Sequence, residues 1–529
     1  MQLFLHKLES SWYSFLESEG LILDDNIDQS VRQIHICYSD NDFNVYLKDV
    51  FLKGSVVIAP KSIINKSKHK FFRRKIYNKF SLEDYSYVFD NIEASLSYID
   101  DINYGNGKIY SFDDLIDEKW GCSSQINRDI VIGDNNKKTY SEKLCLIDKR
   151  NLRKYMRIII KLAANSLDMP FVYIWKYPKL ALNVFNLRID VDPERTQSEH
   201  LAMDRIKKTF DMSYPWINSI TFAINFYRRA PNYSFFKKYI DLGFDIQSHN
   251  FFHLHYPFSY GNKVNIGKAH EILSEAGIKP IGFISPEYFW YNEISDIIES
   301  YKYKYSASFG FDYSNYPYRP FVNGSVRKYF EISSDPLVYS KIIQNHAPEE
   351  VLSVYKASVS SGIADIDTPC FKYEHPAILG GTNDVFNTIL MEGHSNPDVL
   401  PVRLSDFSEW LEIRNTLRTK ITYNRDAEKF FLRVNNDYNC DISEFSIAYE
   451  KPHSDNVYLY DIRASLKNGF DVSGQKYAKK YKHTNTLMGQ SKYNQKAVKI
   501  DKFGFNTHTR KILQGSGMLL KYQLNNFYL

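Results

Sequence analysis

A regular alternation of strand-like and helix-like segments between residues 187 and 309 constrains the fold of this chain more than any other feature. Short apolar runs alternate there with amphipathic stretches of about 10 to 15 residues. The expected strands are Ile220–Asn225, Phe244–Gln247, Pro280–Ile284 and Tyr305–Phe309, and the expected helices are Tyr233–Leu242, Ile266–Ala276 and Ile294–Tyr301. This pattern predicts an α/β fold with a parallel sheet and right-handed crossovers, often closed into a (β/α) barrel. In such folds the active site lies at the carboxyl-terminal strand ends.

The chain of 529 residues is too long for one ordinary domain. We expect an N-terminal α/β domain over residues 1–170, a barrel over 171–415, a β-rich appendage over 416–467 and a basic tail over 468–529. A hydrophobic content of 43% and an aromatic content of 16% are enough to bury cores, which argues against a disordered chain.

The net charge of +5 is small for this length, but it is unevenly distributed. From Ala464 to Leu529 there are twelve Lys or Arg residues against two acidic ones. Such a tail predicts either peripheral contact with anionic lipids at the inner face of the membrane or a solubilising segment. Nucleic-acid binding is not expected, because the aromatic residues in the tail are loosely spaced and no nucleic-acid motif accompanies them.

The cysteines and the N-terminus bear on the compartment. The five cysteines are odd in number and lack Cys-x-x-Cys spacing, so they indicate neither a disulfide framework nor a cysteine zinc site. The N-terminus has no apolar run of signal-peptide length, and no stretch approaches 18 apolar residues. We therefore expect a cytoplasmic protein with reduced thiols.

Three charged side chains share one face where the strand ending at Asp192 stops. Residues two apart on a strand point the same way, so Arg188, Asp190 and Asp192 cluster two carboxylates with a guanidinium. Alone, an Asp-x-Asp is more often an ordinary solvated strand end, and a glycosyltransferase uses the same pattern to hold a metal and a diphosphate.

A second group of candidate residues, His249-Asn-Phe-Phe-His253, comes just after the expected strand Phe244–Gln247. Two histidines four apart can bind one metal ion if the turn that carries them is helical. They are equally consistent with an aromatic-rich loop that binds no metal, and the nearby His255 leaves open which histidines would be ligands. Asn250 excludes the metalloprotease pattern, which needs Glu there. The separation of 57 residues from Asp192 to His249 matches two βα units, so the motifs together predict a two-His, one-carboxylate metal site.

These motifs resemble those of the polysaccharide deacetylase family, the fourth carbohydrate esterase family, in a divergent form with an Asp-x-Asp first motif. The resemblance covers about 240 residues and implies a distorted (β/α) barrel. By this resemblance Asp190 is the catalytic base, and Asp192, His249 and His253 hold the metal. Asn250 stands where the family usually has Ser or Thr.

The third family motif, Phe-Arg-x-Pro, departs from the pattern. It reads Phe283-Ile284-Ser285-Pro286 here, so the Arg that steadies the base is absent. Arg188, on the same strand face as Asp190, is the candidate to replace it as a catalytic residue; the alternative is that Arg188 pairs with another acid.

The last family motif supplies a His that protonates the departing amine, and His375-Pro376 resembles it. His346 and His394 are the fallback candidates. Asp312 lies where another motif would line the pocket, and Arg403–Arg414 resembles the helix that often closes such domains.

The resemblance implies a metal-dependent hydrolase that removes an N-acetyl group from an amino sugar of a surface polysaccharide or its precursor. The expected cofactor is a divalent metal ion, zinc first, with cobalt, nickel, iron or manganese as alternatives. Two other functions stay open: a catalytically impaired glycan-binding or assembly protein that keeps the fold, and a deformylase or amidase on the same scaffold.

Overall fold

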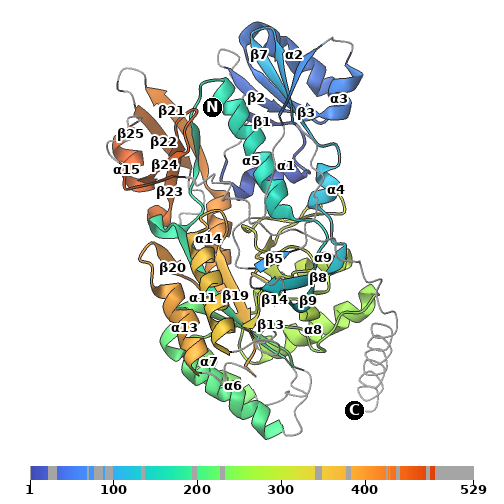
Figure 1. The fold of residues 1–529 in the computed structure, drawn as a ribbon, viewed down its shortest axis with the longest axis vertical. Helices are drawn as coiled ribbons and strands as arrows, with labels where there is room; N and C mark the ends of the chain where they lie inside the picture. The colour runs from blue at the N-terminus through green and yellow to red at the C-terminus, as the bar shows by residue number, and fades with distance from the viewer. Residues whose placement is uncertain are drawn as a thin grey trace.

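The computed structural model describes residues 2–21, 32–67, 71–76, 87–89, 99–132, 137–192, 199–226, 233–339, 348–376, 383–424, 427, 429–435, 441–471 and 477–482. A sheet near the N-terminus forms one end of the molecule, with the helices α2 (Asp40–Lys53) and α3 (Lys61–Lys66), and the helices α6 (Glu199–Ser213) and α7 (Tyr233–Asp241) form the other (Figure 1). The helix α5 (Lys149–Ser166) runs from this N-terminal sheet towards the middle of the molecule. No helix in the described ranges combines the length and the apolar character that a membrane crossing requires.

The central sheet is parallel throughout, as the alternation predicts. Its strands are β18 (Phe330–Glu331), β15 (Tyr305–Ala307), β14 (Gly282–Ile284), β13 (Asp245–Ser248), β12 (Ile220–Ile224), β11 (Asn183–Val191) and β19 (Cys370–Glu374), and β20 (Val399–Pro401) also pairs with β11. All nine residues of β11 are buried, because helices cover both faces of a parallel sheet.

Where a helix was expected, one is present, and its limits agree within two residues except for the helix expected at Ile266–Ala276, which begins seven residues earlier, at Ser259. Besides α6 and α7, the helices that accompany these strands are α8 (Ser259–Glu275), α9 (Asn292–Ser300), α11 (Pro348–Ala364), α13 (Asn383–His394) and α14 (Leu404–Thr416). The helices α6, α11 and α13 had no counterpart in the sequence prediction.

The sheet is a half-barrel rather than a closed barrel. Among the described residues no strand pairing joins β18 to β19. The irregular segment after β18 bridges the gap instead: the Asp335 N–H donates to the Phe371 carbonyl at 2.8 Å, and the Asp335 carboxylate pairs with Lys372. The Tyr339 N–H also donates to the Glu374 carboxylate of β19, so isolated bonds and a buried ion pair replace a strand ladder.

The N-terminal part of the chain contains a mixed sheet. Four strands are parallel, β1 (Gln2–Leu5), β2 (Gln33–Ile36), β3 (Val56–Pro60) and β7 (Gly107–Phe112), and two antiparallel strands, β6 (Ile99–Tyr104) and β4 (Phe72–Ile76), extend the sheet beyond β7. The accompanying helices are α1 (Ser11–Ser18), α2 (Asp40–Lys53), α3 (Lys61–Lys66) and α4 (Ile116–Trp120). A smaller sheet holds β5 (Tyr87–Phe89), β8 (Gln125–Ile132) and β9 (Lys137–Cys145).

The C-terminal region consists of two small sheets. One contains β10 (Phe171–Ile174), β23 (Ser446–Glu450), β24 (Asn456–Asp461) and β26 (Lys479–Lys482), and the other β21 (Arg418–Asn424), β22 (Lys429–Asn435) and β25 (Phe470–Asp471). The helix α15 (Ile462–Asn468) follows β24. The strand β10 lies where we expected the barrel to begin, yet it pairs antiparallel with β23. Residues 483–529, most of the expected basic tail, lie outside the described residues.

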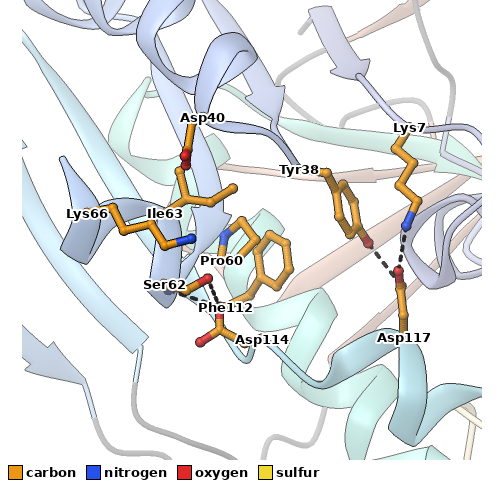
Figure 2. A pocket seen from close by; sticks show the side chains of 10 residues that line it. All are labelled: Lys7, Tyr38, Asp40, Pro60, Ser62, Ile63, Lys66, Phe112, Asp114 and Asp117. Atoms are coloured by element: carbon orange, nitrogen blue, oxygen red, sulfur yellow. Dashed lines mark hydrogen bonds and ion pairs between the residues drawn. The ribbon is translucent and has the colours of Figure 1, made fainter.

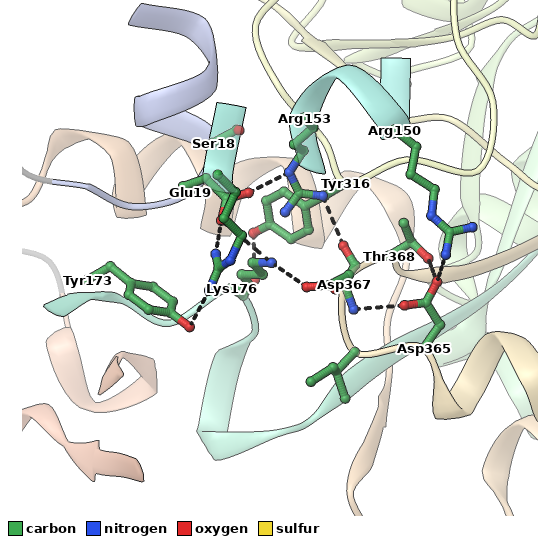
Figure 3. A network of polar contacts seen from close by, with 12 residues as sticks. Ser18, Glu19, Arg150, Arg153, Tyr173, Lys176, Tyr316, Asp365, Asp367 and Thr368 are labelled. Atoms are coloured by element: carbon green, nitrogen blue, oxygen red, sulfur yellow. Dashed lines mark hydrogen bonds and ion pairs between the residues drawn. The ribbon is translucent and has the colours of Figure 1, made fainter. Parts of the chain in front are cut away.

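A buried ion network joins the three regions, and we refer to it as the interdomain joint (Figure 3). It comprises Glu19 after α1, Arg153 and Arg157 of α5, Lys176 after β10, Asp367 before β19, and Glu450 of β23. Although burial alone would raise it, Arg153, Lys176 and Arg157 lower the pKa of Glu19 to about 2.

Candidate metal centre

Three side chains converge at the carboxyl-terminal edge of the half-barrel. Asp192 directly follows β11, and His249 and His253 lie in the loop after β13. The Asp192 Oδ1 is 3.2 Å from Nε2 of His249 and 2.9 Å from Nε2 of His253. One donor atom from each residue lies within 4.8 Å of the others, so the three could hold a single ion.

The hydrogen bonding of His249 decides which of its ring nitrogens is available to bind a metal. Its Nδ1 is 3.0 Å from the carbonyl oxygen of Ile284, and a carbonyl only accepts, so Nδ1 carries the proton in the neutral ring. The Nε2 lone pair of that ring then faces an Asp192 carboxylate oxygen. Metal–ligand bonds of about 2.1 Å place neighbouring donor atoms about 3.0–3.4 Å apart, which fits a divalent cation between these two acceptors.

Charge and exposure at this centre suit a ligand set. Burial opposes ionisation of Asp192, but the nearby imidazoles of His253 and His375 hold its pKa well below the usual value. Burial likewise opposes charge on His253, but Asp192 raises the pKa of that imidazole. The side chain of Asp192 is 31% exposed and that of His249 only 2%, so one side of the cluster is open to solvent.

The loop that carries the histidines is not helical. Residues 249–258 belong to no helix or strand, and Asn250 adopts a left-handed backbone with φ of 62°. The Asn225 side chain donates to the carbonyls of His249 and Asn250 at 3.0 and 3.1 Å. The expectation that His249 and His253 converge through a helical turn is therefore wrong. Their rings converge through an irregular loop, which side chains from neighbouring segments hold in place.

Two asparagines of α8 fix the same loop, and the sequence interpretation missed them. The Asn265 side chain accepts from the Phe252 N–H at 2.6 Å and donates to the Leu254 carbonyl at 2.8 Å. The Asn262 side chain makes a reciprocal pair with the backbone of Tyr256. The available signal was two asparagines three apart near a helix start, because buried asparagine is uncommon without such partners.

Arg188 and Asp190 form a buried pair along β11. The Arg188 Nε and Nη2 atoms lie 2.7 and 2.9 Å from the two carboxylate oxygens of Asp190, and both side chains are 1% exposed. The Arg188 Nη1 also reaches Ser334 Oγ at 3.3 Å. Arg188 thus holds both oxygens of Asp190 in the bidentate geometry that fixes a carboxylate most firmly. Ile284, which stands where the family has Arg, contributes its backbone carbonyl to His249.

His375 lies beside the three metal-ligand candidates. It directly follows β19, the parallel neighbour of β11, and its Nε2 is 3.5 Å from Asp192 Oδ2. Its side chain is 19% exposed, which leaves the ring accessible from the open side of the cluster.

The other histidines differ in position. His394 Nε2 is 3.0 Å from Ser219 Oγ just before β12 begins, at the opposite end of the strands. His346 lies outside the described residues. His255 bonds Ser285 at 2.7 Å, and burial lowers its pKa to about 3, so it is a neutral side chain that packs beside the loop.

Asp312 lies outside the cluster of three metal-ligand candidates. It accepts a hydrogen bond from Asn315 at 2.9 Å, and burial raises its pKa to about 6. Asp312 is therefore a buried carboxyl group that bonds within residues 308–315 rather than to the metal-ligand candidates.

Comparisons with known proteins give fold-level similarity only. No protein-family model and no curated protein matches the chain. Among solved structures, a protein from Mycobacterium smegmatis assigned as a polysaccharide deacetylase is 15% identical, covers 47% of this chain and 96% of its own, and gives a TM-score of 0.39. The Puue allantoinase is 13% identical, with coverage of 44% and 91% and a TM-score of 0.37. A pseudoenzyme of the fourth carbohydrate esterase family from Bacillus anthracis is 12% identical, with coverage of 43% and 65% and a TM-score of 0.30.

Similarity at this level carries no argument about activity.

Proposed function

We propose that this chain is a metal-dependent hydrolase that removes the N-acetyl group from an amino sugar of a surface polysaccharide or its precursor. The observation that carries the proposal is the convergence of two imidazoles on one carboxylate oxygen: Asp192 Oδ1 lies 3.2 Å from His249 Nε2 and 2.9 Å from His253 Nε2. Asp192, His249 and His253 would hold a divalent ion, zinc first, with cobalt, nickel, iron or manganese as alternatives.

A metal bound there would polarise the amide carbonyl and favour ionisation of an attacking water. Asp190 takes the proton of that water on a carboxylate oxygen, while Arg188 keeps the carboxylate oriented and balances its charge. As water adds to the carbonyl carbon, the C–N bond breaks and acetate forms. His375 donates the proton from its Nε2 to the leaving nitrogen, which departs as the free amine.

The alternative of an impaired, glycan-binding protein rested on the missing Arg at Ile284. Arg188 weakens this alternative, because it places a guanidinium on both oxygens of Asp190 from the same strand. The cation that the family takes from its third motif is thus available from β11. We therefore favour catalysis.

The decisive experiment is an acetate-release screen of the metal-loaded protein on nucleotide-linked and oligomeric N-acetyl sugars. Asp190→Asn should lower the rate by about 10²–10⁴-fold with bound metal unchanged, because it removes the proton acceptor and spares the ligands. Full activity of Asp190→Asn would contradict the assignment of the base. Formate or ammonia in place of acetate would instead identify a deformylase or amidase.

We also propose that residues 464–529 bring the enzyme to the cytoplasmic face of an anionic membrane, where a lipid-linked or growing glycan would be available. The support is their twelve basic residues against two acidic ones, each worth about 1 kcal/mol near such a surface. Co-sedimentation with anionic vesicles, lost on removal of residues 483–529, tests this. The domain limits 1–170, 171–415, 416–467 and 468–529 are likewise proposals, for limited proteolysis to test.

A further inference from the structure

The N-terminal domain contains a pocket of about 420 Å³ that has no part in the proposed hydrolysis (Figure 2). It lies at the carboxyl-terminal ends of the parallel strands β1, β2, β3 and β7, and all four loops after these strands contribute to its lining. This edge is where open parallel sheets bind small molecules, and the volume falls in the range of small-molecule sites.

One side of the pocket is fixed by its own contacts. The Asp117 carboxylate accepts from the Ser11 N–H at 2.9 Å, from the Tyr38 hydroxyl at 3.2 Å and from Lys7 Nζ at 3.2 Å. These bonds hold the Tyr38 ring and the Lys7 ammonium group in place, with the ammonium 4.8 Å from the ring centroid. This side is therefore a preorganised wall.

The other side carries polar groups whose bonding capacity is unused. The exposed Asp40 carboxylate and Lys66 ammonium make no ion pair or hydrogen bond with any residue that the structure describes. Asp114 accepts from the Ser62 N–H and hydroxyl with one oxygen only, at 2.9 and 2.6 Å. Figure 2 shows Asp40 and Lys66 on the side away from Lys7 and Asp117, with the apolar Ile63 and Phe112 between.

The chemistry of the lining selects among ligands. Three carboxylates against two ammonium groups repel a phosphate or a nucleotide. A lipid tail would leave the charged groups unsatisfied. A ring with one apolar face and several hydroxyl groups suits the lining, because carboxylates accept from hydroxyl groups, Lys66 donates, and Ile63 and Phe112 offer an apolar surface.

We propose that this pocket binds one pyranose unit of a glycan, and that it prefers an amino sugar with a free amine to its N-acetylated form. The excess of carboxylate over ammonium groups favours the cationic amine. The pocket would be a second glycan-binding position, separate from the metal centre. The choice of an amino sugar as its ligand rests on the proposed N-deacetylase function. The pocket would retain the deacetylated product.

Ligand-observed NMR titration of the full chain with glucosamine, N-acetylglucosamine, glucose and inorganic phosphate tests the proposal. Glucosamine should bind most tightly. Asp40→Asn and Lys66→Met should each weaken that binding roughly tenfold, because each removes a hydrogen bond to a charged group. Lys48→Met, at an exposed lysine of α2 outside the pocket, is the matched control and should change nothing.

The same titration on Asp192→Asn separates this proposal from the proposed hydrolase. That variant alters the metal centre and leaves the pocket intact, so glucosamine should still bind and should still depend on Asp40. Absence of sugar binding, tighter binding of phosphate or N-acetylglucosamine, or no effect of Asp40→Asn and Lys66→Met would each overturn the proposal. Retained binding without acetate release on any substrate would contradict only the hydrolase.

Discussion

The metal centre and the interdomain joint both gather charged side chains from distant segments, but they match those charges differently. At the joint, Glu19 faces Arg153, Arg157 and Lys176, and the remaining cationic atoms reach Asp367 and Glu450. At the metal centre, Nδ1 of His249 is engaged by the Ile284 carbonyl, so in the neutral ring the Nε2 lone pair faces Asp192 and two acceptors meet.

This difference separates a structural cluster from a functional one. Buried charges are tolerated when every one has a partner, and a cluster that satisfies all of them offers nothing to a ligand. A cluster with facing acceptors is complete only when a cation lies between them. Variants of the metal centre should accordingly lose bound metal and activity, whereas variants of the interdomain joint should lose stability.

The largest effect is expected from Asp192→Asn. The change removes the anionic ligand that both histidines approach, so bound metal should fall from one ion per chain to near zero. Acetate release should drop by at least about a thousandfold, because several kcal/mol of transition-state stabilisation is lost. Elemental analysis and the acetate assay measure the two losses. Full metal occupancy in this variant would rule out Asp192 as a ligand.

Glu19→Gln should act on stability and spare the metal. It leaves Arg153, Arg157 and Lys176 short of one buried counter-charge, which costs about 3–5 kcal/mol of unfolding free energy. Urea unfolding measures this cost, and metal content should be unchanged. Asp241→Asn, which breaks the exposed pair between Lys237 and Asp241, is the control and should change stability by less than about 0.5 kcal/mol. Equal effects of the two variants would contradict the role of the joint.

Acid should weaken the joint within a defined pH window. The pKa of Glu19 is about 2 in the folded chain against an ordinary value of 4.5, so the folded state binds its proton less readily than the unfolded state. The stabilisation is therefore complete above about pH 4.5 and is lost as the pH falls towards 2, by an amount on the order of a few kcal/mol. Unfolding at about pH 5, 4 and 3 should show a steeper loss in the wild type than in Glu19→Gln. Parallel curves would show that Glu19 contributes nothing to the pH dependence.

The sequence carried the information that is local or periodic. The strands β12 to β15 and the helices α7 to α9 follow from alternating apolar patterns, which report burial along one segment. The two motifs at Asp192 and His249 lie after β11 and β13 because parallel strands end at one edge.

Long-range pairing could not be predicted in this way. The apolar run of β10 does not reveal that its partner is β23, and nothing near β18 shows that the sheet stays open towards β19. The bend at Asn250 depends on side chains from Asn225 and Asn265, which lie in other segments. The sequence likewise left open whether Arg188 pairs with Asp190 or with another acid, and only the distances between their atoms decide this.

The smallest effect is expected from Arg188→Lys, which tests whether the metal centre needs a bidentate partner for its base. Lysine keeps the charge but offers a point contact where the guanidinium binds both carboxylate oxygens of Asp190. The maximal rate should fall about tenfold, and Arg188→Met should lower it about a hundredfold, with metal content and KM unchanged in both. Loss of this buried pair lowers stability in Arg188→Met whatever its role, so the rate per folded molecule decides: a purely structural role would leave that rate intact in both variants. Full activity of Arg188→Met would show that the base works without a cation, and the loss of Arg at Ile284 would then need no replacement.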